Sequence, residues 1–164
     1  MQKEKITLKC QDETLEVELD VIKKSVILRN MIEDTGNDGE IKIPNIELHI
    51  LKKVIEYCEH YKDTEPKEIA KPLKSKNLIE NGASEWDEEY IESIKSVEEL
   101  VDVIVAANFL DIEGLLNLGC AKVATMIKGK SVQEIRDIFG IENDFTPEEE
   151  AQLIEENRWA EEAF

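Results

Sequence analysis

The stretch that most narrows the fold reads Asn143-Asp144-Phe145-Thr146-Pro147-Glu148-Glu149-Glu150-Ala151-Gln152, and Glu156-Asn157-Arg158-Trp159 follows it. Thr146 is a favoured N-cap residue, Pro147 suits the first helical position, and Glu149 at the third can complete a capping box. We therefore expect an acidic helix that begins at Pro147 and ends beside Trp159. Phe145 precedes this helix, and a short charged helix cannot bury two large aromatic side chains within itself. A partner surface is the expected destination of both rings.

The composition excludes several classes of function. The chain has 164 residues, with 38 acidic and 20 basic side chains and a net charge of -18. Such a surface repels nucleic acid and anionic lipid, because binding to either depends on Lys and Arg. Apolar runs are too short to span a membrane, and no leader pattern opens the sequence, so we expect neither a membrane segment nor a signal peptide.

The three cysteines indicate a reducing compartment. Cys10, Cys58 and Cys120 are odd in number and far apart, and they form no Cys-x-x-Cys pair that would suit zinc. We expect three reduced thiols that pack as small hydrophobic side chains, in a cytoplasmic and nuclear protein.

The N-terminal part mixes strands and helices. Alternating apolar residues predict a hairpin over residues 6–19 and a third strand at 41–43. Ser25 is expected to cap a short helix, and Asn45 a longer one that continues to about residue 60. We expect residues 1–62 to form the first part of an α+β body.

Residues 63–95 interrupt this pattern. Prolines, glycine and charges dominate, so we expect a flexible charged insertion. Its first half is basic for so acidic a chain: the lysines of this stretch are Lys62, Lys67, Lys71, Lys74 and Lys76. Trp86 is expected to anchor the end of the insertion onto the body, and contact with a ligand is the alternative.

The remainder is helical. Ser96 with Glu99 and Ser131 with Glu134 predict capping boxes, Asp111 predicts a cap between them, and glycines at 129 and 140 predict helix ends. We expect residues 96–128 to complete the body and residues 129–164 to form C-terminal helices. The fold class is then α+β, with a helical extension after a body of short strands and helices.

Nothing in the sequence indicates catalysis, a cofactor or a metal centre. His49 and His60 share one predicted helix without a recognisable nucleophile motif, and no glycine-rich phosphate loop is present. Glu148, Glu149 and Glu150 are consecutive on a helix, so they point in different directions and do not form a metal site.

An apolar set on the last helices allows two interpretations. One is an ordinary helical core, which suits Val123 and Ile138 in particular. The other is a groove that receives a partner's helices, which we favour for the aromatic residues and most of the isoleucines. The set comprises Val123, Ile127, Ile135, Ile138, Phe139, Ile141, Phe145 and Trp159. Asn108 and Phe109 occupy a predicted helix–helix corner, where an aromatic side chain can also be core filler.

Three stretches resemble the S-phase kinase-associated protein 1 family, the adaptors of SCF-type ubiquitin ligases. They are the acidic stretch above, Ala106-Ala107-Asn108-Phe109-Leu110-Asp111-Ile112-Glu113-Gly114-Leu115-Leu116, and Val123-Ala124-Thr125-Met126-Ile127-Lys128-Gly129-Lys130-Ser131. The resemblance implies a BTB/POZ-like body and a non-enzymatic adaptor that links F-box substrate receptors to a cullin. It implies that the apolar set binds the F-box and that Asn108 and Phe109 contact the cullin. In some unicellular members the proline that matches Pro147 is hydroxylated, which makes Pro147 a candidate for modification.

Three rival interpretations stay open. An elongin C-like adaptor would share the body but lack the segment after Gly129. A self-associating acidic regulator would use the same groove, and the free chain would then be a homodimer. The third is an enzyme, although the sequence contains no residues to which catalytic roles can be assigned.

Overall fold

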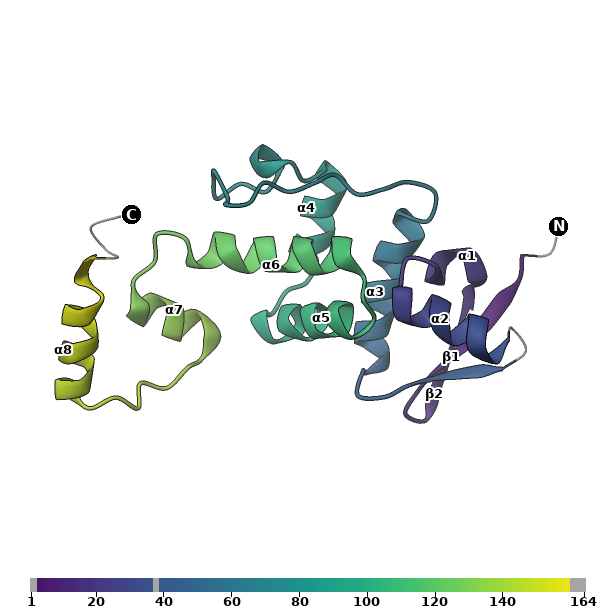
Figure 1. Cartoon of the computed structure of the whole chain (residues 1–164), viewed down its shortest axis with the longest axis horizontal. Helices are drawn as coiled ribbons and strands as arrows, with labels where there is room; N and C mark the ends of the chain where they lie inside the picture. Colours follow the sequence, from purple (N-terminus) through teal and green to yellow (C-terminus); the bar gives the residue numbers. More distant parts are fainter. Residues whose placement is uncertain (1–2, 37–38, 160–164) are drawn as a thin grey trace. The chain divides into compact units, whose positions relative to one another are not determined.

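The computed structural model describes residues 3–36 and 39–159 (Figure 1). The chain divides into two compact units, Met1–Gly129 and Lys130–Phe164, which we call the body and the C-terminal unit. Within the described residues, no helix combines the length and the apolar character that crossing a bilayer requires.

The body contains a small mixed sheet with the order β2-β1-β3. β1 (Lys5–Cys10) and β2 (Glu13–Glu18) form the expected hairpin, in which Leu8 faces Leu15. β3 (Glu40–Ile43) pairs with β1 in parallel and places Ile41 beside Leu8. The alternating pattern is confirmed, because Leu8, Ile41 and Ile43 are buried while Lys42 is exposed.

Helices cover the sheet and build the core of the body. They are α1 (Leu19–Ile22), α2 (Val26–Thr35), α3 (Leu48–His60), α5 (Val97–Phe109) and α6 (Glu113–Ile127). Both α3 and α6 pack against α5 (Figure 1). Val54, Val103 and Leu115 are fully buried at the centre, and each such side chain contributes about 1.5–3 kcal/mol by leaving water.

Ser25 caps α2 as expected, since its hydroxyl accepts the Leu28 N–H. Two other predicted caps are wrong. Asn45 has φ +61° and Asp111 has φ +52°, so both occupy left-handed turns just before their helices. The caps are instead Glu47 for α3 and Ile112 for α6, neither of which makes a side-chain cap bond. Asn and Asp tolerate left-handed backbone well, and the turn takes precedence over the cap.

Residues 63–95 are more structured than their composition indicates. A 3-10 turn, η1 (Ile79–Asn81), and the helix α4 (Glu85–Glu92) form there. Ser84 and Asp87 complete a capping box at α4. Buried apolar side chains tie the segment to the core; they are Ile69, Leu78, Ala83, Tyr90, Ile91 and Ile94. The sequence analysis did not predict α4, because its apolar stripe is short and most of its residues are acidic.

The C-terminal unit contains α7 (Val132–Phe139) and α8 (Pro147–Glu156). The capping boxes at Ser131 and Thr146 are confirmed in full, and Pro147 occupies the first turn of α8. Gly140 ends α7 with φ +64°, as expected of a glycine stop. At Ser96 the hydroxyl accepts the Glu99 N–H at 3.1 Å, which is the half of the predicted box that the structure contains.

Candidate partner-binding surfaces

Helix α7 presents a half-buried apolar stripe. Ile135, Ile138 and Phe139 recur at helical spacing and are each partly exposed. The one buried side chain among the residues of α7 is Arg136, whose guanidinium lies 3.1 Å from Glu150 of α8. An ion pair, together with a hydrogen bond from Asn143 to Glu150 at 3.3 Å, thus connects α7, α8 and the loop between them. The apolar stripe is left accessible.

Helix α8 buries none of its residues within the described chain. Phe145 is 45% exposed, Ile141 57% and Trp159 69%. Leu153 and Ile154 are also exposed, and sequence reasoning did not single them out. They were missed because they are only two neighbouring apolar residues in a Glu-rich helix. Two such residues without a core partner nevertheless indicate an interaction surface. Large exposed side chains so close together mark an interaction surface.

The expected F-box-binding residues divide between the two units. Val123 and Ile127 lie on α6 of the body, where Val123 packs against the core and Ile127 is 37% exposed. The other six lie in the C-terminal unit, and no described residue of that unit forms a core with them. The core interpretation therefore suits Val123, whereas Phe145 and Trp159 are open to a partner.

A second apolar surface lies on α5 of the body. Phe109 is 43% exposed and Asn108 is exposed, while the neighbouring Leu110 is fully buried and fills the corner. Val101 and Val105 precede Phe109 by two turns and one turn, and they are 41% and 60% exposed. We call Val101, Val105, Asn108 and Phe109 the α5 face. Val101, Val105 and Phe109 recur every four residues, which the sequence shows. They were not identified together as a surface because α5 was interpreted as a core helix.

Beside the α5 face lies a hollow of about 330 Å³. Pro44 and Ile46 of the loop after β3 form one wall, and Val105 and Phe109 form the other. Asp102 adds a carboxylate at its edge. A preformed hollow beside exposed apolar side chains can accept a bulky residue of a partner. The walls of the hollow therefore come from two elements that lie far apart in the sequence.

Trp86 anchors α4 to α3, as the first of the two interpretations predicts. Its ring stacks on His60 with centroids 3.7 Å apart and on Tyr90 at 5.0 Å. Tyr61 donates a hydrogen bond to the buried Asp87 at 2.6 Å. Burial, and then the Asp87 carboxylate, raise the pKa of Tyr61 to about 12. Tyr61 and Tyr90 use their hydroxyl groups within the body, which favours a structural role for the cluster.

The remaining reactive side chains form no catalytic arrangement among residues 3–36 and 39–159. His49 lies 3.2 Å from the exposed Glu47, and His60 is held in the aromatic stack. No group of three possible metal ligands occurs in this part of the chain. The expectation for the cysteines is wrong at one position: Cys10 and Cys58 are buried, but Cys120 is exposed. Burial raises the pKa of Cys58 to about 12.

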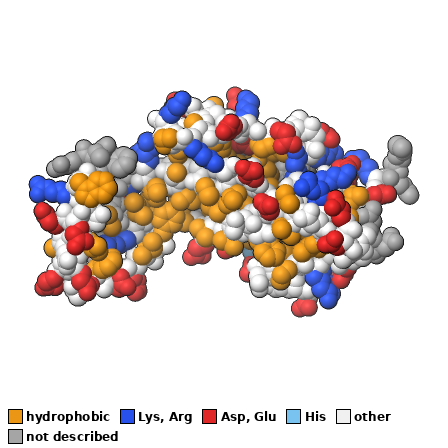
Figure 2. Space-filling model, viewed as in Figure 1, with side chains coloured by type: hydrophobic (Ala, Val, Ile, Leu, Met, Phe, Trp, Pro, Cys, Tyr) orange, Lys and Arg blue, Asp and Glu red, His pale blue; other side chains and the backbone are white. Residues whose placement is uncertain are grey.

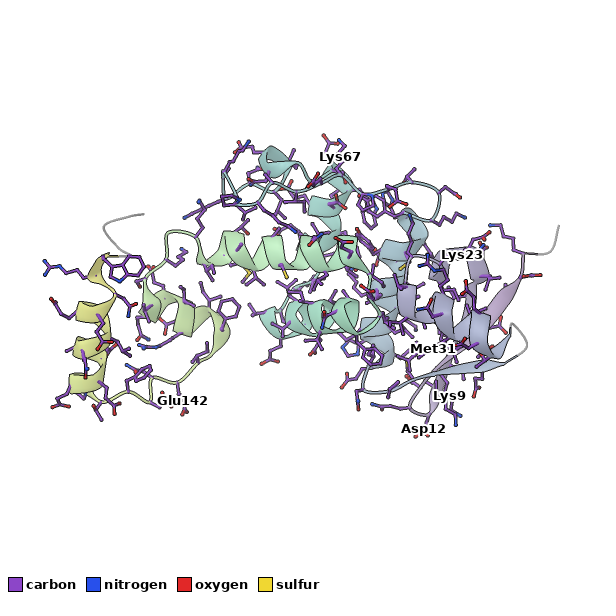
Figure 3. All side chains as sticks on the ribbon, viewed as in Figure 1. Lys9, Asp12, Lys23, Met31, Lys67 and Glu142 are labelled. Carbon is purple, nitrogen blue, oxygen red and sulfur yellow. The ribbon has the colours of Figure 1, made fainter. Side chains whose placement is uncertain are left out.

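Acidic side chains spread over the face drawn in Figure 2, in keeping with the net charge. Figure 3 shows Glu142 on the connection between α7 and α8, and Lys67 on the segment that leads to α4. The two apolar surfaces thus lie within an acidic exterior, which would favour partners with basic rims.

Comparison with known proteins identifies the class and then the family. The Skp1 family tetramerisation domain matches residues 4–63, and the Skp1 family dimerisation domain matches residues 113–160. The S-phase kinase-associated protein 1 homolog of Tetrahymena thermophila is 53% identical over 156 residues, which are 95% of this chain and 93% of that protein. The E3 ubiquitin ligase complex SCF subunit sconC of Arthroderma benhamiae is 47% identical over 160 residues, 96% of each chain.

The protein has an α+β, BTB/POZ-like body with a helical extension. It belongs to the Skp1 family. Both family domains match it in order, and residues 113–160 include α7 and α8. An elongin C-like chain that ends before these helices is therefore excluded.

Proposed function

We propose that this chain is a non-enzymatic adaptor that holds an F-box substrate receptor and a cullin in an SCF-type ubiquitin ligase. The observation that carries the proposal is the presence of two separate exposed apolar surfaces, one on α5 of the body and one in the C-terminal unit. Curated relatives that are about half identical over nearly the whole chain are named as SCF subunits. This chain is expected to work in the cytoplasm and the nucleus.

The C-terminal surface is assigned to the receptor. Its α7 stripe and the aromatic residues beside α8 suit the mode in which a partner's helices fill an apolar groove. Val123 and Ile127 of α6, on the body, are assigned to the same partner. The residues assigned to the F-box are Val123, Ile127, Ile135, Ile138, Phe139, Ile141, Phe145 and Trp159.

The α5 face is assigned to the cullin. Asn108 offers a side-chain amide beside the exposed ring of Phe109, and the hollow next to them accepts a cullin side chain. Binding of both partners raises the effective concentration of a tethered substrate at the ligase. The chain's own chemistry is not needed for ubiquitin transfer.

Binding experiments with separate partners test these assignments. Ile135→Asp or Trp159→Ala should weaken the binding of an F-box domain and preserve that of a cullin N-terminal domain. Asn108→Lys combined with Phe109→Lys should do the reverse. Loss of both partners in a variant that keeps its helical circular dichroism would contradict two independent surfaces.

Two further proposals concern the free chain. Exposed apolar residues of the C-terminal unit are expected to favour a homodimer until a receptor binds, and concentration-dependent light scattering would detect it. Pro147 is exposed at the first turn of α8 and is accessible to a hydroxylating enzyme. Intact mass of the native protein would reveal the added oxygen atom, and an unmodified mass would contradict that proposal.

A further inference from the structure

A second groove lies on the body between residues 69–73 and helix α6. It encloses about 430 Å³. Ile69 and Leu73 line the side formed by the segment before η1, and Ala121, Ala124 and Ile127 line the side formed by α6. Its floor is apolar, and Ile127 also belongs to the set assigned to the F-box. One residue of the groove is therefore also a proposed receptor contact on the body.

Lysines surround this groove without carboxylate partners. Lys71 and Lys128 line it, and they donate hydrogen bonds to neutral oxygens, Asn117 Oδ1 at 3.0 Å and the Leu73 carbonyl at 3.4 Å. The ammonium group of Lys76 lies near Gly129, the residue that follows Lys128. Among the described residues, none of these three lysines forms an ion pair. We call this site the lysine-rimmed groove.

The groove combines cationic side chains with an apolar floor in a chain that is acidic overall. Acidic side chains outnumber the basic ones by 38 to 20, and several lysines elsewhere on the body pair with carboxylates, as Lys24 does with Glu65 and Lys3 with Glu18. Lys71 and Lys128 place two cations beside this floor, and no Asp or Glu is among the described residues that line the groove. The groove is therefore a local site of opposite sign to the chain as a whole.

We propose that the lysine-rimmed groove binds an acidic peptide segment with bulky apolar side chains, carried by the substrate receptor outside its F-box. Apolar side chains would fill the groove while Asp and Glu pair with Lys71 and Lys128. The receptor is the fitting source because Ile127, which lines the groove, is itself assigned to the F-box. This inference rests on the proposed function.

A bilayer is a poorer occupant. An anionic membrane meets a broad surface, so the net charge of -18 repels it even where a few lysines attract it. A peptide meets the groove alone and is affected chiefly by the charges within a Debye length, about 8 Å at physiological salt. A second copy of this chain is the other alternative, because its α8 is also acidic and apolar.

Cys120 provides a reporter of occupancy, since it lines the groove and is exposed while Cys10 and Cys58 are buried. The probe is the labelled peptide acetyl-Asp-Glu-Leu-Glu-Glu-Phe-Leu-Asp-Glu-amide, added to the full chain. Two control peptides replace its acids by their amides or its apolar residues by Ser. Binding is followed by fluorescence anisotropy, and protection is followed by the rate at which N-ethylmaleimide alkylates Cys120.

The acidic peptide should bind and slow Cys120 alkylation, and both controls should bind at least about tenfold more weakly. Lys71→Glu with Lys128→Glu should weaken binding of the acidic peptide by about tenfold or more. It should also remove the protection of Cys120, which is measured in each variant as the alkylation rate with and without peptide. Lys42→Glu, which reverses an exposed lysine of β3, should change neither readout. Thermal unfolding shows that each variant is folded.

Several results would overturn the proposal. They are equal binding of the acidic and amide peptides, protection that survives the double lysine variant, or binding to phosphatidylserine vesicles without binding to the peptide. Self-association that the double variant abolishes would assign the groove to a second copy. Ile135→Asp distinguishes the groove from the proposed F-box surface: it should weaken the binding of an F-box domain and preserve the binding of the peptide. If neither Ile135→Asp nor the double lysine variant changes the binding of a complete receptor, the adaptor function is contradicted, whether or not the peptide binds.

Discussion

Arg136 Nη1 lies 3.1 Å from Glu150 Oε1, and this ion pair joins α7 to α8 in a unit that has few buried side chains. The Arg136 hydrogen bond, and then that of Asn143, lower the pKa of Glu150 from its ordinary value of 4.5. A carboxyl whose pKa is lower in the folded state stabilises that state above the unfolded pKa. The contribution disappears as the pH falls through the folded pKa.

We therefore expect the contact between α7 and α8 to weaken in acid below about pH 4.5. Amide hydrogen exchange in α8 should accelerate there relative to exchange in α5. Glu150→Gln should show fast exchange already at neutral pH and no further acid step from this site. An acid step of unchanged size in Glu150→Gln would assign the loosening to other carboxylates.

The α5 face predicts a matched pair of variants. Val105→Lys should weaken cullin binding by about tenfold or more, because it places a charge in an apolar contact, with a change in stability within about 0.5 kcal/mol. Val103→Lys, two residues away and fully buried, should unfold the body by leaving a charge in the core. Titration with a cullin domain and chemical denaturation measure the two effects. Unchanged cullin affinity in Val105→Lys would exclude Val105 from the interface.

Gly82 is expected to be intolerant of a side chain. Its φ is +110°, and an added Cβ would lie 2.5 Å from the Glu68 carbonyl oxygen, a backbone atom that cannot rotate away. Gly82→Ala should lower the free energy of unfolding by about 1–3 kcal/mol. Gly39→Ala, which meets nothing within 4 Å, should change it by less than about 0.5 kcal/mol. Similar urea midpoints for the two variants would show that the segment before η1 yields without cost.

The tyrosines of the chain predict an alkaline transition. All three, Tyr57, Tyr61 and Tyr90, lie in the cluster around Trp86. Burial raises the pKa of Tyr61 to about 12 and holds the pKa of the other two well above the ordinary value of 10. A raised folded pKa stabilises the fold below pH 10, and this contribution is lost as the pH rises through 12.

Ultraviolet absorbance of phenolate should therefore show almost no ionisation of the native chain at pH 10, whereas the denatured chain is half ionised there. Unfolding at higher pH should release all three tyrosines together. A native phenolate that titrates near pH 10 would show that the aromatic cluster opens in solution.

Local signals predicted most of the elements. Capping boxes at Ser131 and Thr146, the glycine stop at Gly140 and the alternation in β1 each depend on residues within a few positions, and all are present. Asn45 and Asp111 show where this fails. Each is a good cap by type, yet the tertiary path requires a left-handed turn at that residue, and no local pattern specifies the path.

Sequence reasoning identified some of the exposed apolar residues of the candidate surfaces and missed others. Phe109 and Trp159 were identified from the sequence, and their exposure agrees with a role in partner binding. Val105 was missed because valines at 103 and 105 look alike in the sequence, and only the packing of α5 against α3 and α6 decides which is buried. The roles of individual residues in binding stay predictions.

The aromatic anchor described above has a practical consequence. The two tryptophans of the chain are divided between the units: Trp86 stacks on His60 and Tyr90 in the body, and Trp159 is 69% exposed in the C-terminal unit. An indole in water emits at longer wavelength than one in a packed aromatic cluster, so the protein carries two intrinsic fluorophores of different colour. Trp86→Phe would leave Trp159 as an intrinsic reporter of receptor docking, and Trp159→Phe would leave Trp86 as a reporter of body unfolding, each without an added label.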